Sequence, residues 1–330
     1  MPDATDSPAV DALAEGLRPA GPADASDVEP GAGRRLIGVL RKRPGAIVGA
    51  AGLLLLVLVA VLAPVIAPYS PDVQSGAVYG PPSSAHLLGL SDQGVDVLSQ
   101  LLWACRVSLL VGFAAAVVSI VIGGTVGIVA GYFGGRTDLV LALITDYFIV
   151  VPALPVLIVA AAVWGPSLSH IIIVIGVLLW TGTARVVRAQ VKSVRERAYV
   201  QRARSLGAGN LRIVLRHVLP QIAPLLIAST VLTIAVAIFD ETALSFLGLG
   251  DPSTTSLGRV IENAFQRAAI SAGAWWAIVW PGVLVTLIIL GCSLIGGALE
   301  DALNPRLGAA HVSARTFRLR PLVGRGTSSL

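Results

Sequence analysis

Six long stretches with almost no charged residues decide what this chain of 330 residues can fold into. No charge occurs for 28 residues between Arg43 and Asp72, or for 29 residues between Arg106 and Arg136. A helix needs about 20 mostly apolar residues to cross the hydrocarbon core of a bilayer. With 55% hydrophobic and 13% charged residues, the chain also lies far from the composition of a soluble domain. The sequence therefore predicts an all-α membrane protein with six transmembrane helices.

The uncharged stretches place the six predicted spans along the chain. Their approximate bounds are 46–68, 107–131, 139–163, 170–188, 222–248 and 275–298. Together they make one predicted membrane domain, residues 36–306. The preceding residues, 1–35, are acidic and rich in Ala, Pro and Gly, which indicates a disordered tail. Residues 307–330 have the composition of a second loose tail.

Lys and Arg residues are distributed unevenly among the predicted loops. Residues 69–100 contain none, whereas nine lie between Arg185 and Arg216. Since basic loops stay on the cytoplasmic side of a membrane, both termini and this basic segment are expected in the cytoplasm. The pattern predicts a multi-pass membrane protein. It also accounts for the net charge of +5, so that no nucleic acid partner is expected.

The residues that usually carry catalysis or bind metals and nucleotides form no recognisable pattern. The four histidines have no second ligand three or four positions away, which argues against a metal site. Neither Lys42 nor Lys192 belongs to a Gly-Lys-Ser/Thr phosphate loop. Cys105 and Cys292 lie far apart in apolar sequence and are expected to be packing residues. We therefore expect no enzyme activity and no cofactor in this chain.

Polar residues inside the predicted spans are candidates for a solute pathway. Asp146 is the one acid well inside a span, and burial of its charge is costly. We expect Asp146 to face the interior of the helix bundle, either as a structural hydrogen-bonding group or as part of a pathway. Thr230, Thr233 and Glu241 complete the candidate set.

Glycines recur every fourth residue in the second predicted span. Gly123, Gly127 and Gly131 would lie on one helix face, and Gly124 lies beside them. Small residues at this spacing let a second helix approach closely in a membrane. We expect this face to be a site of tight helix packing.

A basic segment, YVQRARSLGAGNLRIVLRHVLP (199–220), interrupts the apolar stretches. Gly207 could end a first short helix in the left-handed conformation, and Asn210 could cap a second one. In the second helix, apolar residues recur at spacings of three and four, at Leu211, Val214, Leu215 and Val218. We call residues 195–217 the elbow. Its pattern fits two functions, a docking surface for a partner protein or an amphipathic helix on lipid head groups.

Five segments, in order along the chain, carry a resemblance to a known family. They are HLLGLSDQGVDVLSQLLWACRVSLLVGF (86–113), GYFGGRTDLVLALITDYFIVVPALPVLI (131–158), the elbow, ETALSFLGLG (241–250) and GGALEDALNPRL (296–307). The chain resembles the C-type permeases of the dipeptide/oligopeptide/nickel family of ABC importers. The elbow is similar to the family's EAA loop, although Gln201-Arg202 replaces Glu-Ala and Val95 replaces a common basic residue. The ATPase-docking residues that the resemblance implies are Gln201, Arg202, Ala203, Arg204, Gly207, Asn210, Arg212, Leu219 and Pro220.

The resemblance implies a type I importer transmembrane domain that works by alternating access. It implies a second homologous permease, one or two cytoplasmic ATPase subunits that bind ATP and Mg, and an extracytoplasmic solute-binding protein. Short peptides are the expected cargo, with nickel chelates or other small solutes as alternatives. An ion-driven secondary carrier is a further alternative, but such carriers need ion sites in broken helices and often contain internal repeats.

Overall fold

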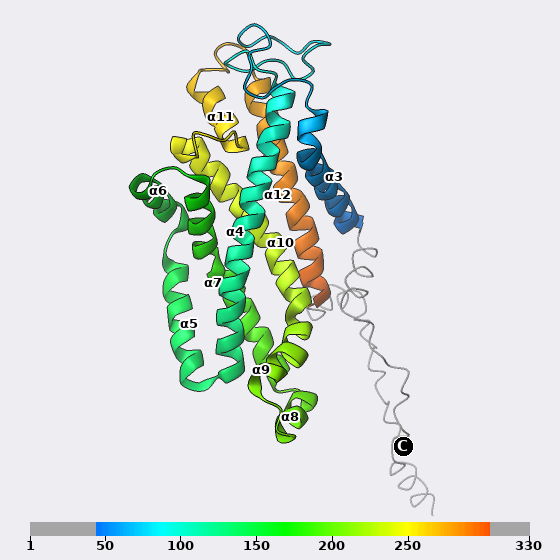
Figure 1. The fold of residues 1–330 in the computed structure, drawn as a ribbon, viewed down its shortest axis with the longest axis vertical. Coiled ribbons are helices and arrows are strands. Elements are labelled where there is room, and N and C mark those ends of the chain that lie inside the picture. Colours follow the sequence, from blue (N-terminus) through cyan, green and yellow to red (C-terminus); the bar gives the residue numbers. More distant parts are fainter. Residues whose placement is uncertain (1–43, 304–330) are drawn as a thin grey trace, which may run out of the picture.

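A computed structural model describes residues 44–303, and its regular secondary structure in that range is helical. The predicted tails, 1–35 and 307–330, lie outside the described residues. The long helices of residues 44–303 run side by side along the long axis of the molecule (Figure 1). They are α3 (Pro44–Ile66), α4 (Val97–Phe133), α7 (Leu168–Arg195), α10 (Leu219–Leu244) and α12 (Trp276–Leu303).

Shorter helices connect the long ones. They are α5 (Gly135–Val150), α6 (Ala153–Trp164), α8 (Ala198–Ser205), α9 (Asn210–Ile213) and α11 (Leu257–Gln266). The π-helical segments η1 (Val214–Val218) and η2 (Ser245–Leu249) extend α10 at its two ends. Within residues 44–303, five helical segments can cross a membrane by length and composition, or six if α5 and α6 count as one bent span. The predicted all-α membrane fold is therefore confirmed.

The third predicted span is divided into two helices. The sequence suggests one span over 139–163, whereas α5 and α6 meet at an angle of 81°. Pro152 lacks an amide hydrogen and restrains Val151, which is extended with φ −70° and ψ 119°. An apolar stretch in the sequence indicates that a segment can lie in lipid, but it does not indicate whether the helix bends there.

Two other helices extend well beyond their apolar stretches. Helix α4 begins ten residues before the predicted bound of 107, because the Asp96 carboxylate accepts a hydrogen bond of 2.9 Å from the Ser99 amide. Helix α7 continues to Arg195 rather than ending near 188. Apolarity marks the segment that lipid can surround, whereas the helix itself continues where caps and neighbours support it.

The glycine-bearing face of α4 packs closely against α7. A Cβ atom added at Gly127 would lie 2.7 Å from the Ala184 carbonyl oxygen, and one at Gly131 would lie 2.8 Å from that of Arg188. Such distances leave room for hydrogen but not for a side chain. The predicted close approach is confirmed, and it holds α7 in a fixed position against α4.

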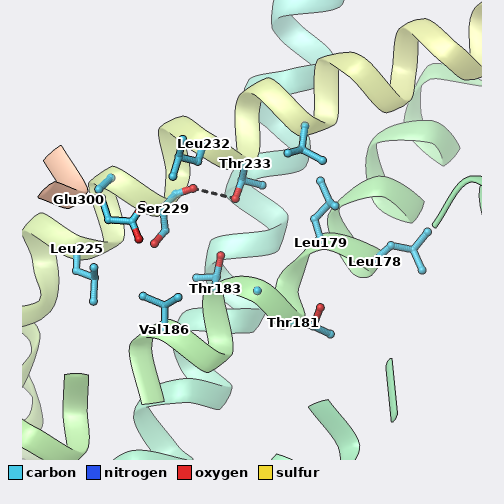
Figure 2. A pocket seen from close by; sticks show the side chains of 13 residues that line it. Leu178, Leu179, Thr181, Thr183, Val186, Leu225, Ser229, Leu232, Thr233 and Glu300 are labelled. Atoms are coloured by element: carbon cyan, nitrogen blue, oxygen red, sulfur yellow. Dashed lines mark hydrogen bonds between the residues drawn. The ribbon is translucent and has the colours of Figure 1, made fainter. Parts of the chain in front are cut away.

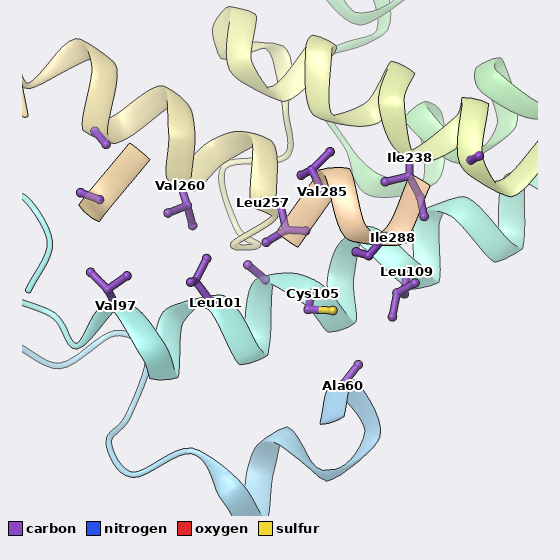
Figure 3. Close-up of a cluster of buried hydrophobic side chains, with 14 of the residues drawn as sticks. Ala60, Val97, Leu101, Cys105, Leu109, Ile238, Leu257, Val260, Val285 and Ile288 are labelled. Carbon is purple, nitrogen blue, oxygen red and sulfur yellow. The ribbon is translucent and has the colours of Figure 1, made fainter. Parts of the chain in front are cut away.

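The largest apolar core joins α3, α4, α10, α11 and α12. Figure 3 shows Cys105 among leucine, isoleucine and valine side chains of these helices. Cys292 belongs to the same cluster, and both thiols are free and buried. Their expected role as packing residues is confirmed.

Residues 67–96 cross one end of the bundle, which we call the cap end (Figure 1). The Trp276 indole donates a hydrogen bond of 3.2 Å to the Leu90 carbonyl oxygen, and the Arg267 guanidinium lies 2.9 Å from the Asp92 carboxylate. Burial raises the pKa of the Asp92 carboxyl even though Arg267 acts in the opposite direction. The elbow lies at the opposite end of the molecule.

Candidate functional site

The elbow, residues 195–217, runs from the end of α7 through α8, a glycine turn and α9 into η1. Gly207 has a φ of +80°, the left-handed conformation that ends α8. The Gly207 amide donates to the Arg204 carbonyl oxygen at 3.0 Å, and the Ala208 amide donates to that of Ala203 at 3.1 Å. These paired bonds close the helix end in the manner typical of a glycine terminus. The expected conformation of Gly207 is confirmed.

Asn210 does not cap α9, contrary to the expectation from sequence. The capping position belongs to Gly209, whose backbone is extended, and Asn210 is the first helical residue. Its side-chain oxygen accepts a hydrogen bond of 3.0 Å from the Tyr132 hydroxyl at the end of α4. The Asn210 side chain thus binds a residue from a distant part of the chain and does not bind the nearby backbone.

Buried valine and isoleucine side chains fasten the elbow to the bundle. Val200 of α8, Ile213 of α9 and Val218 of η1 have no exposed surface. They pack in one cluster with Tyr132 and with α7 residues such as Val191. The elbow is thus a rigid extension of the bundle.

The opposite side of the elbow exposes both apolar and basic side chains. Leu206 is 87% exposed and Leu211 is 72% exposed, beside the exposed residues Arg202, Arg204 and Arg212. These arginines form no ion pair with any residue between 44 and 303. An apolar ridge surrounded by uncompensated positive charge is suited to contact with an acidic protein surface or with anionic lipid.

The predicted apolar stripe of the second elbow helix is divided between two faces. Val218 points into the core, whereas Leu211 and Leu215 point outward. The reason is the π-helical turn η1, which adds a residue to the turn and shifts the register of the side chains. The 3.6-residue period on which the expectation rested does not hold through this segment.

Gln201, the departure from the family pattern, makes a contact within the chain. Its side-chain amide donates a hydrogen bond of 3.1 Å to the Arg195 carbonyl oxygen at the end of α7. It therefore bridges the break between α7 and α8. Leu219 is half-buried at the start of α10, and Pro220 lies in the first turn, where its missing amide hydrogen costs nothing.

A groove of about 380 Å³ lies between α7 and α10 (Figure 2). Most of the lining surface is apolar, and leucine and valine side chains are its main apolar contributors. Four hydroxyl side chains also line it, those of Thr181 and Thr183 on α7 and of Ser229 and Thr233 on α10. Glu300 of α12 borders the end of the groove that is nearer to the elbow.

Of the two threonines predicted to line a pathway, only one lies on the groove. Thr233 lines it, whereas Thr230 does not. Both hydroxyls donate to backbone carbonyl oxygens one helical turn earlier, as hydroxyls inside apolar helices usually do. Four further lining residues could not be predicted from the sequence, because only the packing of the helices shows that they share a surface: Thr181, Thr183, Ser229 and Glu300.

Asp146 does not point into the bundle, contrary to the expectation from its charge. Its side chain is 61% exposed on α5 and lies 2.8 Å from the Arg185 guanidinium of α7, which is 59% exposed. The expectation assumed that the Asp146 charge is isolated within a span. The ion pair with Arg185 lowers the free-energy cost of that charge. Asp146 therefore joins α5 to α7 at their surface.

Glu241 lies in the interior and not on the groove. It is 2% exposed and accepts hydrogen bonds from the Ser245 hydroxyl at 2.7 Å and the Ser108 hydroxyl at 3.1 Å. Ser108 in turn accepts a bond from the Leu257 amide at the start of α11. Glu241 therefore joins α4, α10 and α11.

Apolar helices that can span a membrane, an open groove with hydroxyl groups between two of them, and a rigid basic elbow at one end define the membrane-embedded subunit of a transport system. A family model described as "Binding-protein-dependent transport system inner membrane component" matches residues 123–309. A second model, "N-terminal TM domain of oligopeptide transport permease C", matches residues 33–82. The chain therefore belongs to the family of inner membrane permeases of binding-protein-dependent ABC importers, of type I fold.

Several curated proteins are similar over most of their length. A dipeptide transport system permease protein of Bacillus subtilis is 36% identical over 269 residues, which cover 81% of this chain and 84% of the relative. An oligopeptide transport system permease protein of Mycobacterium tuberculosis is 36% identical over 280 residues, which cover 83% and 95%. A Brucella suis protein with the provisional name of peptide transport system permease protein is 38% identical over 271 residues, which cover 81% and 90%.

Proposed function

We propose that this permease moves short peptides across the bacterial cytoplasmic membrane, driven by ATP hydrolysis on partner subunits. The cargo is supported by the names of the relatives, which are permeases for dipeptides, oligopeptides or peptides. The chain contains no Gly-Lys-Ser/Thr loop, so ATP and Mg belong to other subunits. The partners are a second permease, one or two ATPases and an extracytoplasmic solute-binding protein.

The elbow is the observation that supports coupling to an ATPase. Its exposed ridge combines Leu206 and Leu211 with arginines that form no ion pair among the described residues. Its buried side is fixed to α7 and α10, so that a push on the elbow reaches helices on both sides of the groove. Under this proposal the elbow end and both termini face the cytoplasm, and the cap end faces outward.

The groove between α7 and α10 is proposed as this chain's part of the peptide pathway. Hydroxyl groups can exchange hydrogen bonds with a peptide backbone, and the leucine and valine lining tolerates different side chains. Asp146 and Glu241 are not part of this pathway, since one pairs with Arg185 and the other is enclosed.

Peptide uptake by reconstituted complexes tests this function. The complete transporter, purified with its partner chains and placed in liposomes, is expected to accumulate a labelled dipeptide or oligopeptide only with ATP and the binding protein. A nickel chelate supplied in the same assay should not be taken up. Accumulation driven by a proton or sodium gradient without ATP would show instead that the chain is a secondary carrier.

Filling the groove tests the pathway. Ser229→Trp places an indole in the groove and should reduce peptide uptake more than tenfold. Ile227→Trp is the matched control, because Ile227 lies on the same helix, is 47% exposed and does not line the groove. Equal uptake by the two variants would place the pathway elsewhere.

A further inference from the structure

Tyr132, at the end of α4, contacts three parts of the elbow at once. Its hydroxyl donates to the Asn210 side chain of α9 at 3.0 Å, and its carbonyl oxygen accepts from the Arg195 guanidinium at 3.0 Å. The guanidinium of Arg204 on α8 lies over its ring, 5.5 Å from the centroid. Although Tyr132 ends a helix, it is only 2% exposed. A displacement of the elbow must therefore act on this residue.

The chain reverses direction directly after Tyr132. Gly134 has a φ of +68°, and α5 begins at the next residue. A Cβ atom at Gly134 would lie 2.5 Å from the Arg195 guanidinium nitrogen, so that Arg195 occupies the inner side of this turn. The turn into α5 is held by the same arginine that holds the Tyr132 carbonyl.

Beyond this turn, α5 is weakly attached to the described part of the bundle. Thr145 is its one buried residue. Its polar attachments are ion pairs to α7, from Asp138 to Lys192 at 2.6 Å and to Arg188, and from Asp146 to Arg185. The Asp146–Arg185 pair is exposed, and the less exposed Asp138 pairs with long side chains that are 32% and 42% exposed. Ion pairs of this kind tolerate small shifts better than interlocked apolar side chains do. Helix α5 can thus follow a movement of the turn without disrupting a core.

We propose that Tyr132 is a positioning residue that transmits movement of the elbow into α5. The hydrogen bond from its hydroxyl to Asn210 is the link, and the turn at Gly134 is the hinge. This inference rests on the proposed function, in which an ATPase displaces the elbow. It adds a second route out of the elbow, separate from the continuous path through η1 into α10.

Two substitutions break this link from opposite sides. Tyr132→Phe removes the hydroxyl and keeps the buried ring, and Asn210→Ala removes an exposed side chain. Each should lower the amount of peptide moved per ATP hydrolysed about fivefold, which corresponds to the loss of about 1 kcal/mol of hydrogen bonding. The double variant should be no worse than either single one, because all three lack the same bond.

Tyr199→Phe is the matched control. This tyrosine is also in the elbow, but its hydroxyl makes no hydrogen bond with a described residue, so the variant should keep the wild-type ratio. A wild-type ratio in Asn210→Ala, or losses that add in the double variant, would overturn the inference. If Tyr132→Phe fails to reach the membrane, Asn210→Ala decides alone.

Hydrogen–deuterium exchange on the purified full-length chain separates failure of this inference from failure of the proposed function. Asn210→Ala should speed exchange about fivefold in the first turns of α5 and leave α3 unchanged. This readout needs no ATPase and no peptide. Unchanged exchange in α5 contradicts the link, whereas a wild-type complex that does not couple ATP hydrolysis to uptake contradicts only the proposed function.

Discussion

Gly207 allows a direct test of the elbow at the scale of one residue. With a φ of +80°, a residue other than glycine is strained there by about 1–2 kcal/mol, and a β-branched one by more. No atom lies within 4 Å of an added Cβ, so the strain is confined to the backbone. Gly207→Val should displace α9 and abolish peptide-stimulated ATP hydrolysis in liposomes, while the protein still reaches the membrane at normal levels.

Gly209→Ala is the control for this substitution. Gly209 also has open space around it, but its φ is −65°, which any residue adopts. This variant should couple normally. Normal coupling in Gly207→Val as well would indicate that the elbow lies on lipid and does not dock an ATPase.

Glu241 allows a test of a buried polar cluster. Glu241→Ala leaves the hydroxyls of Ser108 and Ser245 without their acceptor, which should lower stability by about 1–3 kcal/mol. The melting temperature in detergent should fall, and the concentration of peptide that gives half-maximal uptake should not change. Glu241→Gln keeps one acceptor oxygen and should therefore lose less stability than Glu241→Ala. A changed peptide dependence at an unchanged melting temperature would return Glu241 to the pathway.

At the scale of an element, α7 begins with a cap from a distant segment. Its own capping residue, Ser167, makes no side-chain bond, and the Leu168 amide donates instead to the Asp251 carboxylate at 2.8 Å. Asp251→Ala should destabilise the protein by about 1 kcal/mol, measured by thermal unfolding in detergent. Asp251→Asn keeps an acceptor oxygen, so its loss of stability should be less than half of that of Asp251→Ala.

The Asp251 carboxylate should also make the stability of the protein depend on pH. Burial raises the pKa of Asp251, but hydrogen bonds from Ser253 and Leu168 outweigh this and hold the pKa below the ordinary 3.8. A carboxyl whose pKa falls on folding adds stability above its unfolded pKa and loses it as the pH falls through the folded one. The stability difference between wild type and Asp251→Asn should be constant from pH 5 to 8 and shrink below about 3.8. A difference that grows with acid would contradict this assignment.

At the scale of the whole molecule, the elbow and the cap are predicted to face opposite sides of the membrane. Single cysteines at Ser84 and Ser205, both exposed, in a background without Cys105 and Cys292, report this orientation. An impermeant thiol reagent applied to intact cells should label the cap position and spare the elbow position. Ser84 is preferable to Ser83, whose hydroxyl accepts a bond from the His86 amide. Labelling of both positions in intact cells would rule out the proposed topology.

The membrane fold and the elbow could be predicted from the sequence because their signals are local. A bilayer requires about 20 apolar residues for each crossing, so the length of an uncharged stretch reports a span directly. Likewise, α8 ends at Gly207 through two local bonds, from the Gly207 amide to a residue three positions earlier and from the Ala208 amide to a residue five positions earlier. The glycine row of α4 showed where another helix would approach, although it did not identify α7 as that helix.

The tertiary structure alone decided which polar side chains meet. Glu241 is enclosed because Ser108, 133 positions away, faces it, and Asn210 binds Tyr132 across 78 positions. Asp146 was placed wrongly because its cost in a membrane depends on a partner, Arg185, that lies on another helix. Apolar burial is a property of a segment, whereas an ion pair, a hydrogen bond or a groove is a property of two segments and arises only when they pack.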